Sequence, residues 1–225
     1  MKTNDLEVGA LLRYKIITVV FGLTLALTAS AQDFDNGLFA QPITQTTQFG
    51  ISPFYGYRFG GEIQDANSDA KYSLKDAPAY GVILDYAPKD YNGRYEVLWS
   101  RQDTSVDFNG NYGLGVVDMT VDVVQVGGEL EFGSDRFREY ASAHVGATHF
   151  SSDGYGDETK FSFDIGVGVK AFLTKNIYLR GDLRGISTVT QGEGSFIYYN
   201  GVTVATFSGY TLWQGQVSAG VGITF

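Results

Sequence analysis

The last fifteen residues of the chain alternate between an apolar and a polar face. From Thr211 to Phe225 the odd positions include Trp213, Val217 and Val221, whereas glutamine, serine, threonine and glycine occupy most even positions. Strands of soluble proteins usually keep this two-residue period for about 5 or 6 residues, but a strand that crosses a bilayer at a tilt needs about 9 to 11. The run therefore favours a membrane-spanning β-strand.

Seven further segments show the same period, and the connections between segments vary in length in a regular way. The segments are 51–63, 80–86, 94–104, 117–132, 137–150, 160–173 and 177–189. Short connections at 87–92, 133–136 and 174–176 alternate with longer ones at 61–78, 105–116, 151–159 and 190–209. This arrangement predicts an all-β fold, an eight-stranded antiparallel up-and-down transmembrane β-barrel with both termini on the side of the short turns.

The segment 117–132 changes its phase in the middle. Asp118 and Asp122 lie on one face, and Glu129 can join that face only if one extra residue is inserted between them. A β-bulge inserts one residue in this way. We therefore predict a bulge at Val123 and Val124.

The polar faces of the predicted strands carry charges of both signs. They are Arg58, Arg94, Arg138, Lys160, Lys170, Arg180 and Arg184, and Glu62, Asp85, Glu96, Asp118, Asp122, Glu129, Glu131, Asp164 and Asp182. The interior of an eight-stranded barrel is only wide enough for side chains. These groups are expected to point inward and to pair with one another, and a proton or ion path is the alternative.

The N-terminal region has the pattern of an export signal. A continuous apolar stretch from Ile16 to Leu27 follows Arg13 and Lys15, and small residues Ala29-Ser30-Ala31 come after it. Twelve apolar residues are too few for a helix that spans a bilayer, which needs about 20, and the small residues suit a cleavage site. The sequence predicts a signal peptide at 1–31 cleaved after Ala31, a flexible leader at 32–48 and the barrel at 49–225.

Composition excludes several classes of protein. The chain has no cysteine, which excludes disulfide scaffolds, zinc ribbons and thiol nucleophiles. A formal net charge of −9 argues against nucleic acid as a partner, because phosphates require a basic surface.

Two groups of residues are candidates for chemistry. His149, Ser151 and Glu158 superficially resemble the base and nucleophile of barrel lipid A deacylases, but the residues after Ser151 differ from that family's. Asp153, Asp157 and Glu158 do not make the full ligand set of a calcium loop. The sequence therefore predicts no catalytic, cofactor-binding or metal residue, no cofactor and no enzymatic activity, and His144 is expected to join the charged interior.

With the strands placed, the chain resembles small outer-membrane β-barrels, the OmpA-type transmembrane domain and its OmpX-like relatives. The hairpin Val167–Arg184 and the terminal Phe225 carry this resemblance. It implies residence in the bacterial outer membrane, contact with its lipids and lipopolysaccharide, and insertion by the barrel assembly machinery through the strand that ends in Phe225. A monomer is expected.

The resemblance and the location together predict a structural, envelope or surface-interaction role through four extracellular loops, whose partner the sequence does not indicate. A narrow porin-like channel is the main alternative. A lipid A-modifying enzyme and a soluble barrel with an internal ligand are further alternatives.

Overall fold

A computed structural model describes residues 48–65, 71–89, 91–108, 115–134, 136–152, 154, 156–189, 195–199, 202–206 and 211–225. The predicted signal peptide, its cleavage site at Ala31 and residues 32–47 of the predicted leader lie outside the described residues. In the part of the chain that is described, no helix is both long and apolar enough to cross a membrane.

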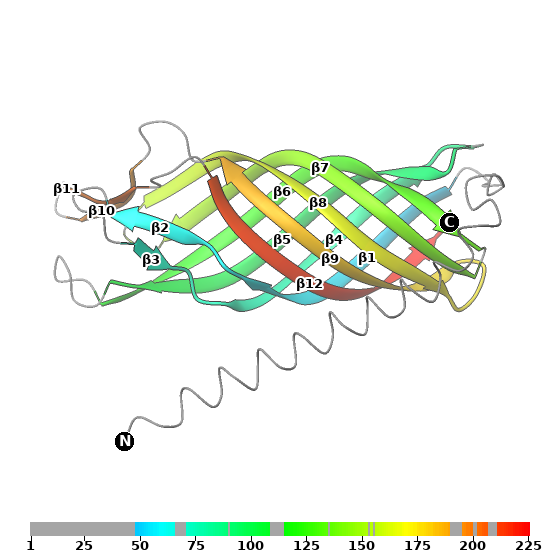
Figure 1. Cartoon of the computed structure of the whole chain (residues 1–225), viewed down its shortest axis with the longest axis horizontal. Helices are drawn as coiled ribbons and strands as arrows, with labels where there is room; N and C mark the ends of the chain where they lie inside the picture. Colours follow the sequence, from blue (N-terminus) through cyan, green and yellow to red (C-terminus); the bar gives the residue numbers. More distant parts are fainter. Residues whose placement is uncertain are drawn as a thin grey trace, which may run out of the picture. The chain divides into compact units, whose positions relative to one another are not determined.

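Within the described residues, eight antiparallel strands close into a barrel in the order β1-β12-β9-β8-β7-β6-β5-β4 (Figure 1). Their bounds are β1 Gln48–Phe59, β4 Ala77–Ala87, β5 Gly93–Asp107, β6 Val116–Gly133, β7 Phe137–Ser152, β8 Gly156–Phe172, β9 Ile177–Val189 and β12 Thr211–Thr224. Each strand pairs with its sequence neighbours in the barrel, and β1 pairs with β12 to close it. The predicted fold class is confirmed.

Two of the predicted long loops contain strands of their own. A second sheet has the order β10-β11-β2-β3, with β2 at Glu62–Asp65, β3 at Lys71–Ser73, β10 at Ser195–Tyr199 and β11 at Val202–Thr206. It lies at the end of the barrel away from the C-terminus (Figure 1). The prediction that Glu62 points into the barrel is wrong, because its side chain is 60 % exposed on β2 and lies 3.6 Å from the Lys71 ammonium.

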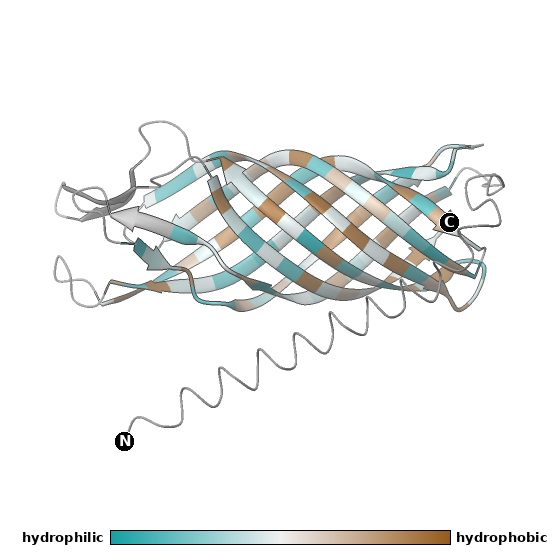
Figure 2. Cartoon of the chain, in the orientation of Figure 1, coloured by the Kyte–Doolittle hydropathy of each residue, from teal (hydrophilic) through white to brown (hydrophobic). Residues whose placement is uncertain are grey.

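An apolar band surrounds the outside of the barrel, and the alternation behind it is visible as brown and teal checks in Figure 2. The outward row of β12 runs from Trp213, 53 % exposed, to Phe225, 73 % exposed. These twelve steps correspond to about 40 Å of strand, or about 30 Å along the barrel axis at the usual tilt. That height matches the hydrocarbon core of a bilayer.

Aromatic side chains border this band on both sides, as in outer-membrane barrels. Near the C-terminus the Phe49 ring lies 5.1 Å from Tyr86 and 6.4 Å from Phe225, between centroids. Toward the other end, Tyr80 lies 6.1 Å from Trp99 and Phe163 lies 5.9 Å from Trp213.

Beyond the second aromatic border the polarity of the wall reverses. Along β6, Val117, Met119, Val121 and Val123 point inward and are buried, whereas Asp118 lies on the outer face and is exposed. The pairing of β6 with both neighbours is unbroken, so the predicted bulge at Val123 and Val124 is wrong.

The change of phase in the sequence reflects a change of surroundings and not an extra residue. Asp118 and Asp122, predicted to be inward, face outward because this part of the wall lies beyond the apolar band. The Asp122 carboxylate receives hydrogen bonds from the Arg101 guanidinium on the outer surface, at 2.7 and 2.9 Å.

The interior beyond the border holds an apolar cluster, which we call the plug. Its members are Tyr72, Leu74, Val106, Phe108, Val117, Met119, Val121, Phe150 and Leu212. Apolar side chains inside and polar side chains outside are the arrangement of a water-soluble β-barrel. The described barrel is therefore apolar outside along one part of its length and apolar inside along the next.

The junction of β1 and β12 differs from the other junctions in the barrel. Pairing covers Gly50 and Ile51, stops at Ser52 and Pro53, and resumes from Phe54 to Phe59. Proline has no backbone N–H to donate. Across the described residues, the other seven junctions of the barrel have continuous registers.

Candidate functional site

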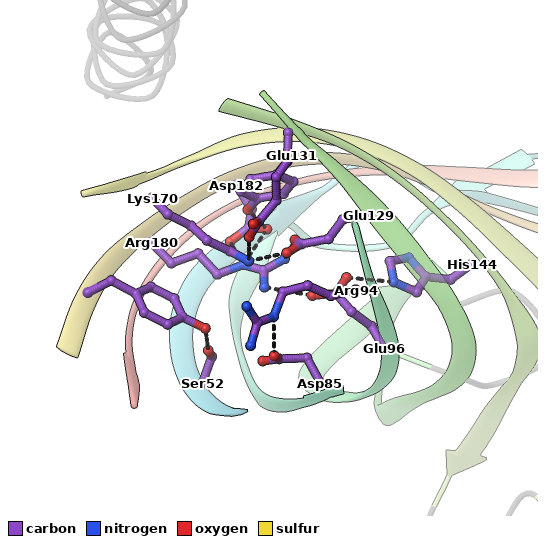
Figure 3. A network of polar contacts seen from close by, with 12 residues as sticks. Ser52, Asp85, Arg94, Glu96, Glu129, Glu131, His144, Lys170, Arg180 and Asp182 are labelled. Atoms are coloured by element: carbon purple, nitrogen blue, oxygen red, sulfur yellow. Dashed lines mark hydrogen bonds and ion pairs between the residues drawn. The ribbon is translucent and has the colours of Figure 1, made fainter. Parts of the chain in front are cut away.

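The part of the interior nearer the C-terminus is filled by a network of charged side chains (Figure 3). It draws residues from strands β4 to β9 because inward positions recur at every second residue. The members are Asp85, Arg94, Glu96, Glu129, Glu131, Arg138, His144, Asp164, Lys170, Arg180, Asp182 and Arg184.

Arg180 is the centre of this network. Its Nη1 lies 2.7 Å from Glu96 Oε1, its Nη2 lies 3.4 Å from Glu129 Oε2, and its Nε donates to Asp182 Oδ1 at 3.0 Å. The guanidinium also lies 4.7 Å from the centroid of the Tyr140 ring. One fully buried cation thus holds carboxylates from three different strands.

The other buried cations of the network have carboxylate partners as well. Lys170 Nζ contacts Glu129 and lies 2.8 Å from Glu131 Oε1. Arg94 contacts Asp85, Arg138 lies 2.9 Å from Glu131, and Arg184 lies 3.0 Å from Asp182 and 3.4 Å from Asp164. Removing one partner of a buried pair leaves an uncompensated charge, so this part of the interior is a tightly coupled unit.

His144 joins the network as the sequence predicted. Its Nδ1 lies 2.9 Å from Asp164 Oδ1 and its Nε2 lies 2.9 Å from Glu96 Oε2. Arg184 Nη1 is farther from Nδ1, at 3.2 Å. The nearest group at each ring nitrogen is therefore a carboxylate oxygen. An ionised carboxylate accepts hydrogen bonds and donates none.

Two tyrosines fit against glycines on the facing strands. The Tyr140 hydroxyl donates to Asp182, and a Cβ on Gly168 would lie 2.3 Å from Tyr140 Cζ. The Tyr178 hydroxyl bonds Ser52 at 2.7 Å, and a Cβ on Gly222 would lie 2.1 Å from Tyr178 Cζ. These glycines make room for the two tyrosine rings in the interior.

The structure places His149 and Ser151 on the same face of β7 but separates Glu158 from both of these residues that resemble deacylase chemistry. His149 lies on the outer surface, where Nδ1 is 2.8 Å from Thr159 Oγ1. Glu158 is paired in register with Phe150 and lies 2.8 Å from Lys160, on the other face of the sheet. Glu158 therefore cannot orient His149.

The candidate cation ligands also stay apart. Asp153 lies outside the described residues, and Asp157 is exposed at the outer end of β8. Among the residues that the structure describes, no group of three His, Cys, Asp or Glu side chains could hold a metal ion.

Sequence reasoning missed two features of the interior. One is the plug. The sequence indicated it at 117–122, where the apolar residues occupy the positions that are polar further along the same strand. The other is Arg58, predicted to point inward, which is fully buried but contacts neutral side chains. No local pattern shows this, because its partners come from strands far away in the sequence.

Comparison with known proteins gave matches among solved structures alone, since no family model and no curated protein sequence matches the chain. The similar structures include the outer-membrane protease OmpT of Escherichia coli, 10 % identical, covering 82 % of this chain and 100 % of that one with a TM-score of 0.41. The prediction that the chain has no enzymatic activity is thereby corrected, because an enzyme stands among the barrels that it resembles.

Neisserial surface protein A is 16 % identical, covers 80 % of this chain and 100 % of that one, and has a TM-score of 0.52. Two further similar structures are the N-terminal barrel domain of Pseudomonas aeruginosa OprF and the attachment invasion locus protein Ail of Yersinia pestis. Each is 17 % identical, and each match covers 80 % of this chain and 100 % of the other chain with a TM-score of 0.40. At such identities the likeness shows the fold. The chain has the closed eight-stranded fold of small bacterial outer-membrane β-barrels.

Proposed function

We propose that the chain is an integral protein of the bacterial outer membrane that displays an acidic interaction surface at the end of the barrel away from the C-terminus. The observation that carries this proposal is the reversal of polarity along the wall. An apolar outer band with aromatic borders suits a lipid bilayer. The adjoining part, with an apolar plug and outward aspartates, suits water.

The distribution of charge supports an interaction role for this outer end. The interior carries six acidic and six basic residues if histidine is not counted, and the segments of the short-turn end carry three of each. The segments of the outer end, counted by their place in the sequence, carry twelve acidic and four basic residues. The acidic ones are Glu62, Asp65, Asp69, Asp76, Asp103, Asp107, Asp118, Asp122, Asp153, Asp157, Glu158 and Glu193, and the basic ones are Lys71, Lys75, Arg101 and Lys160.

A surplus of eight negative charges at one end attracts basic partners and repels polyanions. We therefore infer that the preferred partners of the loops are basic peptides or protein surfaces. The interior, by contrast, is filled by paired charges and the plug, which supports a structural body over a conducting one.

The remaining parts of this proposal concern export and assembly. A signal peptide cleaved after Ala31, contact with membrane lipids and lipopolysaccharide, and recognition of the strand ending in Phe225 by the barrel assembly machinery would follow from this location. A monomer is consistent with a barrel whose wall closes within one chain.

Epitope insertion tests the orientation. A tag placed in 109–114 should be reached by antibody on intact cells, whereas a tag placed at Ser134 should be reached only after the outer membrane is opened. The full chain should require detergent for extraction from membranes. Recovery in the soluble fraction, or equal labelling of both tags on intact cells, would contradict the proposal.

The second experiment tests the charge preference. Purified protein in detergent is titrated with a lysine-rich peptide and with a glutamate-rich peptide of equal length, at low and high salt. Binding of the basic peptide that weakens as salt rises is expected. Equal binding of both peptides, or binding of the acidic one alone, would remove the interaction role from the acidic surface.

A further inference from the structure

Arg58 differs from the paired cations of the charged network. Its side chain is fully buried, and its guanidinium donates to Gln216 Oε1 from Nε at 3.0 Å and from Nη2 at 2.8 Å. Nη2 also contacts Ser100 Oγ. Nη1 has no acceptor among the described residues, and no carboxylate forms an ion pair with this arginine there. All hydrogen bonds of the buried Arg58 guanidinium therefore go to neutral groups, while the carboxylates of Asp164 and Asp122 attract it only over a longer range.

The side chains around Arg58 form a polar but uncharged layer. Gln102 Nε2 donates to the backbone carbonyl of Arg58 at 3.2 Å, and Gln214 Nε2 donates to Gln102 Oε1 at 3.2 Å. Glutamine and serine side chains can donate and accept hydrogen bonds but cannot neutralise a guanidinium. The layer provides hydrogen-bond acceptors for Nε and Nη2 of Arg58, but it does not neutralise the charge of the guanidinium.

Apolar groups border this layer along part of the wall and toward the outer end. Following the inward positions of β5, Glu96 belongs to the charged network, Leu98 is apolar, Ser100 and Gln102 contact Arg58 or its backbone, and Val106 belongs to the plug. Leu98 packs in a cluster with Phe54, Ile83 and Val123. On the β12 side, Gln216 is paired in register with both Arg58 and Arg184, so the layer adjoins the charged network there.

Ion pairs are distributed unevenly over the cations of the interior. Arg94, Arg138, Lys170, Arg180 and Arg184 each form an ion pair with a carboxylate. Among the described residues of the interior, Arg58 is the one arginine whose hydrogen bonds all go to neutral groups.

We propose that Arg58 binds one monovalent inorganic anion, such as chloride, inside the barrel, with Nη1 as the donor that faces it. A buried charge without a counter-charge at hydrogen-bonding distance is unfavourable, and one small anion beside Nη1 supplies that counter-charge and satisfies the free donor. Because Arg58 is fully buried and the plug lies toward the outer end, the anion enters as the barrel folds and exchanges slowly afterwards. This site does not depend on the proposed interaction role of the loops.

Bromide serves as the probe. The wild-type chain is refolded from urea into detergent with sodium bromide as the salt, transferred to sodium gluconate and crystallised. Anomalous diffraction at the bromine edge should show a peak within hydrogen-bonding distance of Arg58 Nη1. A peak absent from this position, or an ordered water there in bromide-refolded crystals, would overturn the proposal.

Stability gives a second readout with a matched control. Wild-type protein refolded in chloride should unfold at a higher urea concentration than protein refolded in gluconate. This chloride-dependent shift should be lost in Arg58→Gln and kept in Arg101→Gln, which removes a guanidinium from the outer surface instead. An equal shift in both variants would place the effect elsewhere and refute the site. If Arg58→Gln does not fold, the bromide peak in the wild-type protein decides alone.

Discussion

Replacing Arg180 by methionine tests whether the charged network carries the stability of the membrane-spanning interior. Arg180 has ion pairs with Glu96, Glu129 and Asp182 at 2.7 to 3.4 Å, and its side chain is fully enclosed. Methionine keeps much of the volume and removes the charge, which leaves these carboxylates with fewer cations. Breaking a buried pair in this way typically costs about 3 to 5 kcal/mol of unfolding free energy.

The matched control is Arg101→Met. Arg101 pairs with Asp122 at 2.7 Å, but its side chain is 41 % exposed on the outer surface, and exposed pairs contribute about 0.2 to 1 kcal/mol. Urea titrations of the barrel in lipid vesicles give both free energies, with the slope checked for unchanged surface exposure. The expected order is therefore a large loss for Arg180→Met and a small one for Arg101→Met.

A second variant separates loss of charge balance from loss of packing. Arg180→Met combined with Glu96→Gln removes one of the carboxylates that Arg180 compensates, so it should recover part of the lost stability. Equal losses for Arg180→Met and Arg101→Met would refute the view that the enclosed network holds the barrel together. A double variant no more stable than Arg180→Met would show that packing, and not charge balance, determines the effect.

Other substitutions test the two faces of the wall and its interior. Val121→Asp places a charge in the plug and should destabilise the barrel strongly. Asp122→Val on the outer face should cost about 1 kcal/mol or less of unfolding free energy in the same urea titration. The opposite ranking would support the predicted β-bulge at Val123 and Val124 and contradict the unbroken pairing of β6. Leu183→Arg places a charge toward lipid and should cost about 2 to 4 kcal/mol, and a harmless effect would mean that the faces of β9 are inverted. Gly168→Ala should lower the urea midpoint because its Cβ would meet the Tyr140 ring at 2.3 Å, and an unchanged midpoint would show that the ring moves freely. In planar bilayers the purified chain should give no stable conductance of porin size, and reproducible nanosiemens steps would favour the channel alternative.

The alternation of residues was enough to predict the eight barrel strands, but not the short strands β2, β3, β10 and β11 inside two of the predicted loops. The predicted segment 177–189 coincides with β9, and the inward positions of His144, Arg180 and Asp182 are confirmed. A two-residue period divides a strand into two faces with little help from the rest of the chain.

The period does not say which face is inside, and this caused the errors at Asp118 and Asp122. Which face is polar depends on whether lipid or water surrounds that part of the wall, and the surroundings change along β6. Contacts between distant strands were also beyond sequence reasoning. Arg58 meets Gln216 because β1 and β12 pair to close the barrel, and it reaches Ser100 on β5 across the interior.

The interrupted junction at Ser52 and Pro53 gives the barrel a preferred line of opening. Separating two neighbouring strands requires all hydrogen bonds of their junction to break, and this junction is divided into two short stretches. It also joins the first barrel strand to the last, so it forms only after every other strand has been made. In a barrel that has not yet closed, the edges of β1 and β12 are unpaired and can pair with a strand of another protein. Closure then has to join two short stretches, one on each side of Ser52 and Pro53.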